Sequence, residues 1–332
     1  MKGHRFKLFL IACLIFGFGS LSLASYEVYD LVLRPMVAKG GEPFIVAVEK
    51  NTSASEFVQM LKSKHLIKSS RLFLTLIKMQ GLTQRLKAGI YQIKPGESAQ
   101  IFLYRVAAGE VMVESFRIIE GTSLNQVITN LQNAQYLNYN PIDWKSIVGD
   151  HPNPEGLLLA NTYNYNAGSD AKPLLQLANQ HLKQVLESNW ENRSPGLPYK
   201  SSYELLIAAS IIEKETSLAD EKKIIAGVVV NRLKKHMPLQ MDPTVIYALG
   251  ENYNGKLSHN DMSVNSPYNT YVYRGLPPTP IAMVGKEAIE AAAHPLETNY
   301  LYFVAKGDGS HHFSSTYEEQ KEAISHYQSK RT

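Results

Sequence analysis

A run of uncharged residues, Leu8 to Tyr26, lies directly behind three basic residues near the start of the chain, Lys2, Arg5 and Lys7. A membrane-spanning helix needs roughly 17–25 mostly apolar residues. Basic residues ahead of such a span keep that end of the chain in the cytoplasm. Residues 1–26 are therefore predicted to be a single-pass anchor in the cytoplasmic (inner) membrane, with the body of the protein exported.

Two other interpretations of this segment stay open. Ser22 and Ala24 form a small-x-small pattern behind an apolar core, as in a cleaved signal peptide. Leu10 to Cys13 looks like a lipoprotein processing box, although few apolar residues precede the cysteine and the apolar run continues past it. All three interpretations place the body outside the cytoplasm.

The exported body contains no cysteine, because Cys13 is the only one in the chain. An intrachain disulfide and a thiolate metal site are therefore excluded. The formal net charge of +4 suits an anionic neighbour such as a membrane surface or an anionic polymer. The basic residues are scattered, so nothing in the sequence favours nucleic acid as a partner.

Residues 27–113 are expected to form a small α/β region. Residues 44–48 predict a strand, Ser53 with Glu56 a capping box, residues 71–79 a second helix, and residues 90–93 a returning strand. The strand–helix–helix–strand order resembles a LysM module, a fold associated with N-acetylglucosamine polymers. Many small α/β units share this order, so glycan binding by this region stays open.

Part of this pattern recurs further along the chain. Residues 48–53 and 118–123 each run from a strand into a Thr-Ser turn and an amphipathic helix. We therefore expect a second LysM-like strand–helix piece near residues 114–135, inside a larger mixed domain over residues 114–332. The fold class predicted for the whole chain is α+β, with an N-terminal transmembrane helix.

Residues 203–216, YELLIAASIIEKET, are expected to be a helix that ends near Thr216, with Asp242-Pro243 as the N-cap of a later one. Glu213 then lies in the last turn, beside an apolar stripe. The helix dipole and desolvation both raise the pKa of a carboxyl group, as a general acid requires. Glu215, two positions on, points to a different side of the helix. The simpler alternative is that Glu213 is a solvated charge at a helix end.

A series of long motifs resembles the endolytic murein transglycosylases of the MltG, or YceG-like, family. The likeness extends over essentially the whole chain. The motifs, in order, are KAGIY (87–91), ASIIEKET (209–216), NRL (231–233), LQMDPTVIYALG (239–250), SPYNTY (266–271), GLPPTPI (275–281), AAAHP (291–295) and YLYFVAKGDGSHHFSSTYEE (300–319).

The resemblance implies a catalytic role for the first glutamate of the EKET block, Glu213. The implied reaction cleaves the bond between N-acetylmuramic acid and N-acetylglucosamine without water. The acid protonates the glycosidic oxygen and then, as a base, helps the muramic 6-hydroxyl attack the anomeric carbon, leaving a 1,6-anhydro end. The family also implies peptidoglycan strands as substrate, penicillin-binding synthases as partners, and a role in ending strand elongation.

Further candidates for substrate binding lie in the same motifs: Gln240, Tyr268, Asn269, Tyr271 and His311. The aromatic and amide side chains suit sugars, although a packed turn explains Tyr268 to Tyr271 nearly as well. His311 is expected either to bind substrate or to orient Glu213. No ligand spacing for a metal occurs, and the reaction needs no cofactor.

Two other functions remain possible from the sequence. A lysozyme-like hydrolase would use Glu213 as the acid, with Asp242 or Asp261 assisting water. A non-catalytic scaffold would use the LysM-like region to position other cell-wall proteins on peptidoglycan.

Overall fold

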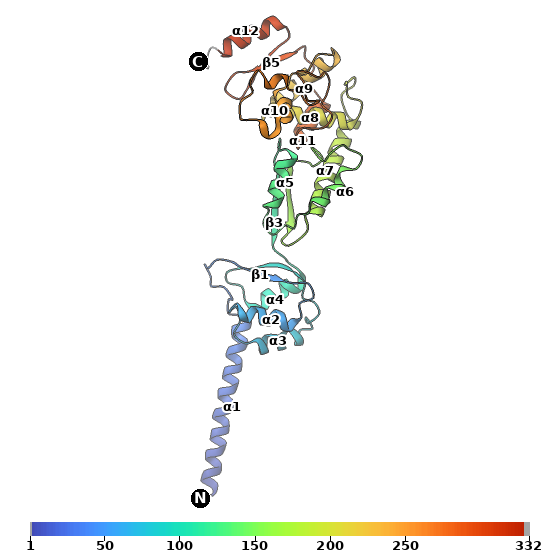
Figure 1. Ribbon diagram of the computed structural model, residues 1–332. Helices are drawn as coiled ribbons and strands as arrows, with labels where there is room; N and C mark the ends of the chain where they lie inside the picture. Colours follow the sequence, from blue (N-terminus) through green and yellow to red (C-terminus); the bar gives the residue numbers. More distant parts are fainter. Residues whose placement is uncertain (1, 329–332) are drawn as a thin grey trace. The chain divides into compact units, whose positions relative to one another are not determined.

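The computed structural model describes residues 2–328, and the chain divides into two compact units (Figure 1). Unit 1 contains the chain up to Glu114 together with Tyr165–Ser169. Unit 2 contains Ser115–Asn164 and the chain from Asp170 onward. Helices and short antiparallel strands occur in both units, which confirms the predicted α+β class.

The chain begins with a long helix, α1 (Lys2–Val32). Within the described part of the chain, no helix combines the length and the apolar character needed to cross a membrane. The predicted membrane anchor is therefore not shown and stays a prediction.

Unit 1 has the predicted strand–helix–helix–strand order, and its elements follow the predicted boundaries closely. The strands pair antiparallel, with Val46 opposite Tyr91. Ser53 and Glu56 form the predicted capping box at the start of the first short helix. The resemblance to a LysM module stays a prediction. The elements after α1 are β1 (Phe44–Val48), α2 (Ala54–Ser63), α3 (Ser70–Met79), β2 (Gly89–Ile93) and α4 (Ala99–Ala108).

The core of unit 1 is a cluster of aromatic rings between the helices and the strand pair. Phe57 stacks on Phe102 with ring centroids 6.2 Å apart, and Tyr91 meets Phe102 edge-on at 6.1 Å. Tyr91, Phe57 and Phe102 are fully buried. Aromatic pairs of this kind add about 0.5–1.5 kcal/mol beyond the area that they bury, so the cluster gives this small unit its cohesion.

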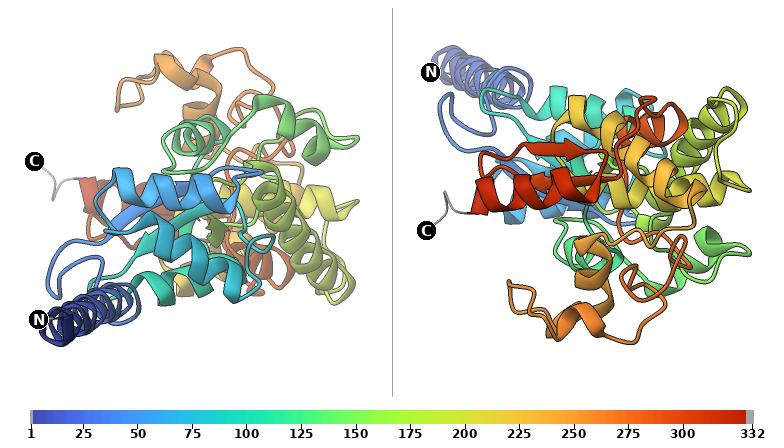
Figure 2. Two further views of the ribbon diagram at one scale, coloured as in Figure 1. Left: turned by 90° about the horizontal axis from the view of Figure 1, so that it is seen from below. Right: turned by 90° about the horizontal axis from the view of Figure 1, so that it is seen from above.

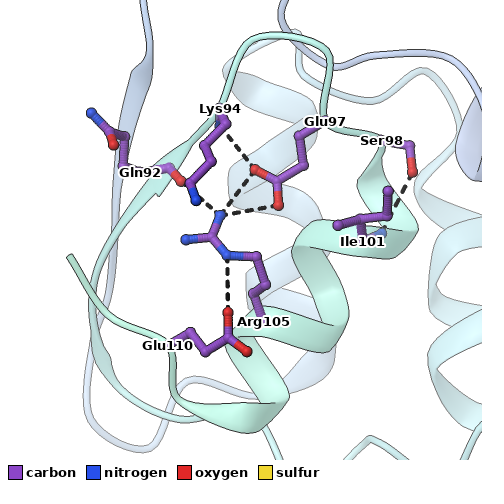
Figure 3. A network of polar contacts seen from close by, with 7 residues as sticks. All are labelled: Gln92, Lys94, Glu97, Ser98, Ile101, Arg105 and Glu110. Atoms are coloured by element: carbon purple, nitrogen blue, oxygen red, sulfur yellow. Dashed lines mark hydrogen bonds and ion pairs between the residues drawn. The ribbon is translucent and has the colours of Figure 1, made fainter.

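Arg105 of α4 ties the helix to the turn that precedes it (Figure 3). Its guanidinium donates to both carboxylate oxygens of Glu97 at 3.0 Å and to the carbonyl oxygen of Gln92 at 2.9 Å. Glu97 also accepts from the backbone N–H of Lys94. Because the partners of Arg105 and Glu97 come from the end of β2 and from the turn that leads into α4, we assign this network a structural role.

Unit 2 is larger and mostly helical, with α8 at its centre. All side chains of α8 from Leu205 to Glu213 are buried. The elements are β3 (Val113–Ile118, in this unit from Ser115), α5 (Leu124–Gln132), η1 (Pro141–Trp144), α6 (Lys145–Val148), β4 (Asn161–Asn166, in this unit up to Asn164), α7 (Ala171–Glu191), α8 (Ser202–Glu215), α9 (Ala219–Lys234), α10 (Asp242–Leu249), η2 (Gly250–Asn252), η3 (Asp261–Ser263), α11 (Lys286–Ala293), β5 (Tyr302–Ala305), β6 (His311–Ser314) and α12 (Tyr317–Gln328).

Neighbouring elements hold α8 in place. Helices α7, α9, α10 and α11 all contact it. Gly227 of α9 lies so close to the chain at Leu296 that an added Cβ would approach its carbonyl oxygen to 2.5 Å. β5 and β6 form an antiparallel hairpin, and α12 packs against that hairpin (Figure 2).

The predicted end of α8 is confirmed, since the helix ends at Glu215 and Thr216 is its C-cap. The prediction that Asp242 is an N-cap is wrong. Met241 is the N-cap of α10, so Asp242 and Pro243 occupy the first two helical positions. Met241 is held there because its backbone N–H donates to the hydroxyl of Thr270 at 3.0 Å. Asp242 is thereby free to make contacts outside the helix.

Candidate active site

The last turn of α8 carries two glutamates whose surroundings differ completely. Glu213 and its partner Lys222 of α9 are both buried, with 3% of each side chain exposed. The Lys222 ammonium donates to Oε1 of Glu213 at 2.7 Å, and the backbone N–H of Gly285 donates to Oε2 at 2.9 Å. Both carboxylate oxygens of Glu213 are therefore occupied by protein groups.

Glu215 faces a cavity of about 260 Å³ in unit 2. Its Oε1 is screened from solvent and has no hydrogen-bond partner among the described residues. Burial, assisted by the negative charge of Asp242, raises the pKa of Glu215 to about 8. A carboxyl group in this state is protonated at neutral pH, as a general acid must be.

The remaining walls of the cavity come from elements far apart in the sequence. The lining residues are Glu215, Arg232, Leu239, Gln240, Asp242, Tyr271, Phe303, Val304, Ala305 and His311. They come from α8, α9, the loop between α9 and α10, the start of α10, the loop between η3 and α11, and the β5–β6 hairpin (Figure 1). The cavity therefore exists only because the fold of unit 2 brings these segments together.

Asp242 and Tyr271 form one side of this cavity. The Tyr271 hydroxyl donates to Oδ1 of Asp242 at 2.5 Å. Burial raises the pKa of Tyr271 well above its usual range, and its hydrogen bond to Asp242 acts in the same direction. Tyr271 therefore stays a neutral hydrogen-bond donor and holds the Asp242 carboxylate near Glu215.

Arg232 and Gln240 form another part of the wall. Arg232 donates to the carbonyl oxygens of Pro238 and Leu239 and to the side-chain oxygen of Gln240 at 3.1 Å. Gln240 has a positive φ of 52°, an uncommon conformation for a residue other than glycine. Residues in strained backbone conformations tend to cluster at functional sites, and Gln240 lies at the edge of the cavity, where Arg232 holds its side chain.

His311 enters the cavity from β6 and is fixed by Glu221 of α9. The ring Nδ1 lies 2.7 Å from Oε2 of Glu221, and the backbone N–H of His311 donates to Oε1 at 2.8 Å. A carboxylate accepts but does not donate, so this contact assigns the proton of a neutral His311 ring to Nδ1. His311 therefore has a fixed position and tautomer at the cavity.

Not all of the residues predicted from the sequence meet at this cavity. Gln240, Tyr271 and His311 line it, whereas Glu213, Tyr268 and Asn269 do not. Asn269 is fully buried and donates to the carbonyl oxygens of Met262 and Val264, so it braces a loop. The Tyr268 hydroxyl bonds to that of Thr279 at 2.9 Å. The contacts of Tyr268 and Asn269 are therefore those of a packed turn, the alternative to substrate binding that the sequence left open.

Sequence reasoning missed three polar residues of the site, Glu215, Arg232 and Glu221. A signal existed for Glu215, because it lies on the side of the helix away from Glu213 and cannot share its surroundings. No sequence signal links Glu221 to His311, which lie ninety positions apart. Among the residues that the structure describes, no group of three or more His, Cys, Asp or Glu side chains could hold a metal ion.

Comparison with known proteins identifies the class. The model of the YceG-like family matches residues 46–326, which is most of the chain. The protein belongs to the YceG-like family.

Similar proteins and a solved structure support membership of the YceG-like family. The chain is 30% identical over 325 residues to an endolytic murein transglycosylase of Bacillus subtilis, covering 89% of this chain and 88% of that protein. It is 26% identical to one of Streptococcus pneumoniae, covering 90% of this chain and 61% of that longer protein. A crystal structure of a yceG-like protein of Listeria monocytogenes superposes with a TM-score of 0.52 at 29% identity, covering 85% of this chain and 99% of that one.

Proposed function

We propose that this protein is an endolytic lytic transglycosylase of peptidoglycan, with Glu215 as its acid and base. The observation that carries the proposal is the carboxyl of Glu215, which lines a polar cavity, has a pKa raised to about 8, and has no hydrogen-bond partner for Oε1 in the described part of the chain. Membership of the YceG-like family, with relatives named endolytic murein transglycosylase, supplies the substrate and the reaction class.

The reaction requires one group that first gives and then takes a proton. Protonated Glu215 donates to the glycosidic oxygen as the bond between that oxygen and the anomeric carbon of N-acetylmuramic acid breaks. The 6-hydroxyl oxygen of the same sugar bonds to the anomeric carbon and closes a 1,6-anhydro ring. The proton of that hydroxyl returns to Glu215, so the enzyme is restored and no water is consumed.

Glu215 suits this role better than Glu213, which resemblance alone indicated. A general acid must reach the proton acceptor within hydrogen-bond distance. Glu213 lies away from the cavity, and its two oxygens are held by Lys222 and Gly285. We assign Glu213 the role of fixing the end of α8, so that Glu215 is held at the cavity wall.

The neighbours of Glu215 have complementary roles in this proposal. The Asp242 charge helps to keep Glu215 protonated. From the same cavity wall it would stabilise the positive charge that develops on the sugar ring in an oxocarbenium-like transition state. His311 and Gln240 offer hydrogen-bonding groups to the substrate at the cavity wall. Because Glu215 acts as both acid and base and the sugar supplies its own nucleophile, Asp242 acts through its charge and forms no bond to the substrate.

We also propose that the protein acts outside the cytoplasm, since peptidoglycan lies there, and that residues 8–26 anchor it in the membrane. The uncharged stretch behind Lys2, Arg5 and Lys7 supports the anchor. Cutting strands close to the membrane would end their elongation beside the penicillin-binding synthases. Retention of the protein in the membrane fraction after washing at high salt tests the anchor, and its release into the soluble fraction contradicts it.

The decisive test compares Glu215→Gln with Glu213→Gln on purified glycan strands. We expect Glu215→Gln to lower the rate by about 10²–10⁴-fold, the usual contribution of a general acid. Mass spectrometry of the wild-type products should show internal cuts with 1,6-anhydro ends. The wild-type rate should also fall as the pH rises through about 8, because the acid form of Glu215 is then lost.

Each alternative has its own outcome in this experiment. Reducing ends that incorporate solvent oxygen would identify a hydrolase. Full activity in Glu215→Gln, with loss of activity in a folded Glu213→Gln, would return the catalytic role to Glu213. No cleavage by folded wild type would favour the non-catalytic scaffold.

A further inference from the structure

A second and larger cavity in unit 2 has no role in the proton transfer. It measures about 640 Å³, within the range of roughly 300–1,000 Å³ typical of ligand pockets. Its walls are the first turn of α5, the Asn153–Glu155 loop, one side of α10, and the end of α8. The lining residues are Gly121, Ser123, Leu124, Asn125, Gln126, Asn153, Glu155, Lys214, Pro243, Ile246, Tyr247, Gly250, Glu251 and Ile281.

The two cavities meet the same two stretches of chain. Lys214 lines the second cavity and Glu215 the first, while Pro243 lines the second and Asp242 the first. In both stretches the two lining residues are consecutive, so the cavities border the same junction between α8 and α10. A linear polymer bound at Glu215 could therefore continue into the second cavity.

Glu155 fixes the inner wall of this second cavity. The side chain is buried, and its Oε1 accepts from the backbone N–H of Leu124 at 2.9 Å while Oε2 accepts from the Tyr247 hydroxyl at 3.1 Å. These contacts tie the start of α5 to α10. Burial raises the pKa of Glu155 to about 7. The wall is thus built before any ligand arrives, which lowers the entropic cost of binding.

The chemistry of the walls selects a neutral polar ligand. The cavity carries two carboxyl groups, Glu155 and Glu251, and one ammonium, Lys214, which already donates to the carbonyl oxygen of Gly121 at 3.1 Å. An acidic peptide would meet the carboxylate of Glu251 and, above about pH 7, that of Glu155 as well, which is unfavourable. The walls therefore offer little to the acidic peptide stems of peptidoglycan.

Hydroxyl and acetamido groups, by contrast, find partners in the cavity. The amide of Asn125 offers a donor and an acceptor, and Tyr247 adds an aromatic ring. The side-chain oxygen of Gln126 already accepts from the backbone N–H of Ser123, so this residue offers its NH₂ group. The side-chain oxygen of Asn153 accepts from the Glu155 N–H, which leaves its NH₂ group available as a donor. Amides, a carboxyl and an aromatic ring together suit an N-acetylated sugar.

We propose that this second cavity is a subsite for a neutral N-acetylated sugar of the glycan strand, next to the sugars held at Glu215. The subsite rests on the proposed function, since it names where a further part of the same substrate binds. It would hold the strand on both sides of the α8–α10 junction and favour cuts within long strands over cuts at short ends.

The test blocks the cavity with a bulky side chain and measures binding without turnover. Asn125 and Asn130 are both exposed on α5, but only Asn125 lines the cavity. Asn125→Trp is therefore the blocking variant and Asn130→Trp its matched control, each made in the full chain carrying Glu215→Gln. The probe is a tetramer of N-acetylglucosamine, titrated by calorimetry and by NMR shifts of residues around Tyr247.

We expect Asn125→Trp to weaken binding of the tetramer by about tenfold, ~1.4 kcal/mol, with Asn130→Trp unchanged. Equal affinity in the parent protein and both variants would overturn the subsite, provided that circular dichroism shows all three folded. Displacement of the tetramer from the Tyr247 region by an acidic stem peptide would also overturn it. This titration needs no cleavage, so its result stands apart from any failure of the proposed reaction.

Discussion

The two glutamates of the last turn of α8 are chemically identical and two residues apart, yet the fold treats them in opposite ways. Glu213 is buried together with a cation and a backbone N–H, which satisfy both of its oxygens. Glu215 borders a cavity, has no cationic partner among the residues that the structure describes, and lies near a second carboxylate, that of Asp242. In the function that we propose, the first arrangement fixes structure, and the second provides the group that gives up a proton.

The difference follows from which elements cover each side of the helix. Toward Glu213, α9 supplies Lys222 and the chain before α11 supplies the N–H of Gly285. Toward Glu215, α10 supplies a carboxylate and the β5–β6 hairpin leaves a cavity. The function of a carboxyl group is thus set by its partners and not by its place in a motif.

Glu213→Gln should give the largest change in stability. The substitution leaves the Lys222 ammonium buried without an anionic partner, since Glu287, the other carboxylate near it, is 3.9 Å away and largely exposed. Breaking one partner of a buried pair costs about 3–5 kcal/mol of the free energy of unfolding. Urea denaturation of the variant and the wild type measures this loss.

A double substitution sharpens the same comparison. Glu213→Met with Lys222→Met removes both charges, so most of the lost stability should return, as it does when buried pairs are replaced by apolar residues. Glu287→Gln is the control and should change stability by less than about 1 kcal/mol, as expected for an exposed pair. If Glu213→Gln alone is as stable as the control, the Glu213–Lys222 pair does not hold the end of α8.

The pH dependence of stability should show the opposite behaviour of Glu215. Its pKa is about 8 in the folded protein and near the ordinary 4.5 when unfolded. Between these values the folded state keeps a proton that the unfolded state has lost, so the free energy of unfolding falls as pH rises from about 4.5 to about 8. The fall should be on the order of a few kcal/mol.

Subtracting a variant isolates this contribution. Glu155, with a pKa of about 7, acts in the same direction in both proteins, so it cancels in the difference between wild type and Glu215→Gln. The stability of Glu215→Gln relative to wild type should rise across this pH range and then level off. Parallel curves for the two proteins would mean that Glu215 is an ordinary solvated carboxyl group.

Much of the local structure followed from the sequence alone. The capping box of Ser53 and Glu56 and the strand at residues 44–48 were predicted correctly, because both depend on neighbours within a few residues. The end of α8 was also predicted correctly. The N-cap of α10 was missed by one residue, because Thr270, 29 positions away, fixes Met241. Sequence patterns within a few residues predict where a helix or strand lies, whereas hydrogen bonds to distant residues can decide the residue at which it begins.

The site was harder to predict, for the same reason. Helical periodicity separates Glu213 from Glu215 but does not reveal that one side holds Lys222 and the other a cavity. Tyr271 and His311, predicted to bind substrate because their motifs are distinctive, line the cavity, and their role in binding stays a prediction. The desolvation that raises the pKa of Glu215 depends on separate segments of the chain meeting around the cavity. Helical periodicity does not predict which segments meet there.

Glu221→Gln should give the smallest of these effects and extends the comparison to a third carboxylate. Glu221 touches the cavity only through His311, so it is a positioning residue. A glutamine keeps the shape, but its amide can donate to Nδ1 and so move the ring proton to Nε2. We expect kcat to fall about tenfold, ~1.4 kcal/mol, with KM nearly unchanged. ¹⁵N NMR of the His311 ring should report the change of tautomer. A rise in KM or a loss of stability with the tautomer unchanged would instead give Glu221 a purely structural role, like that of Glu213.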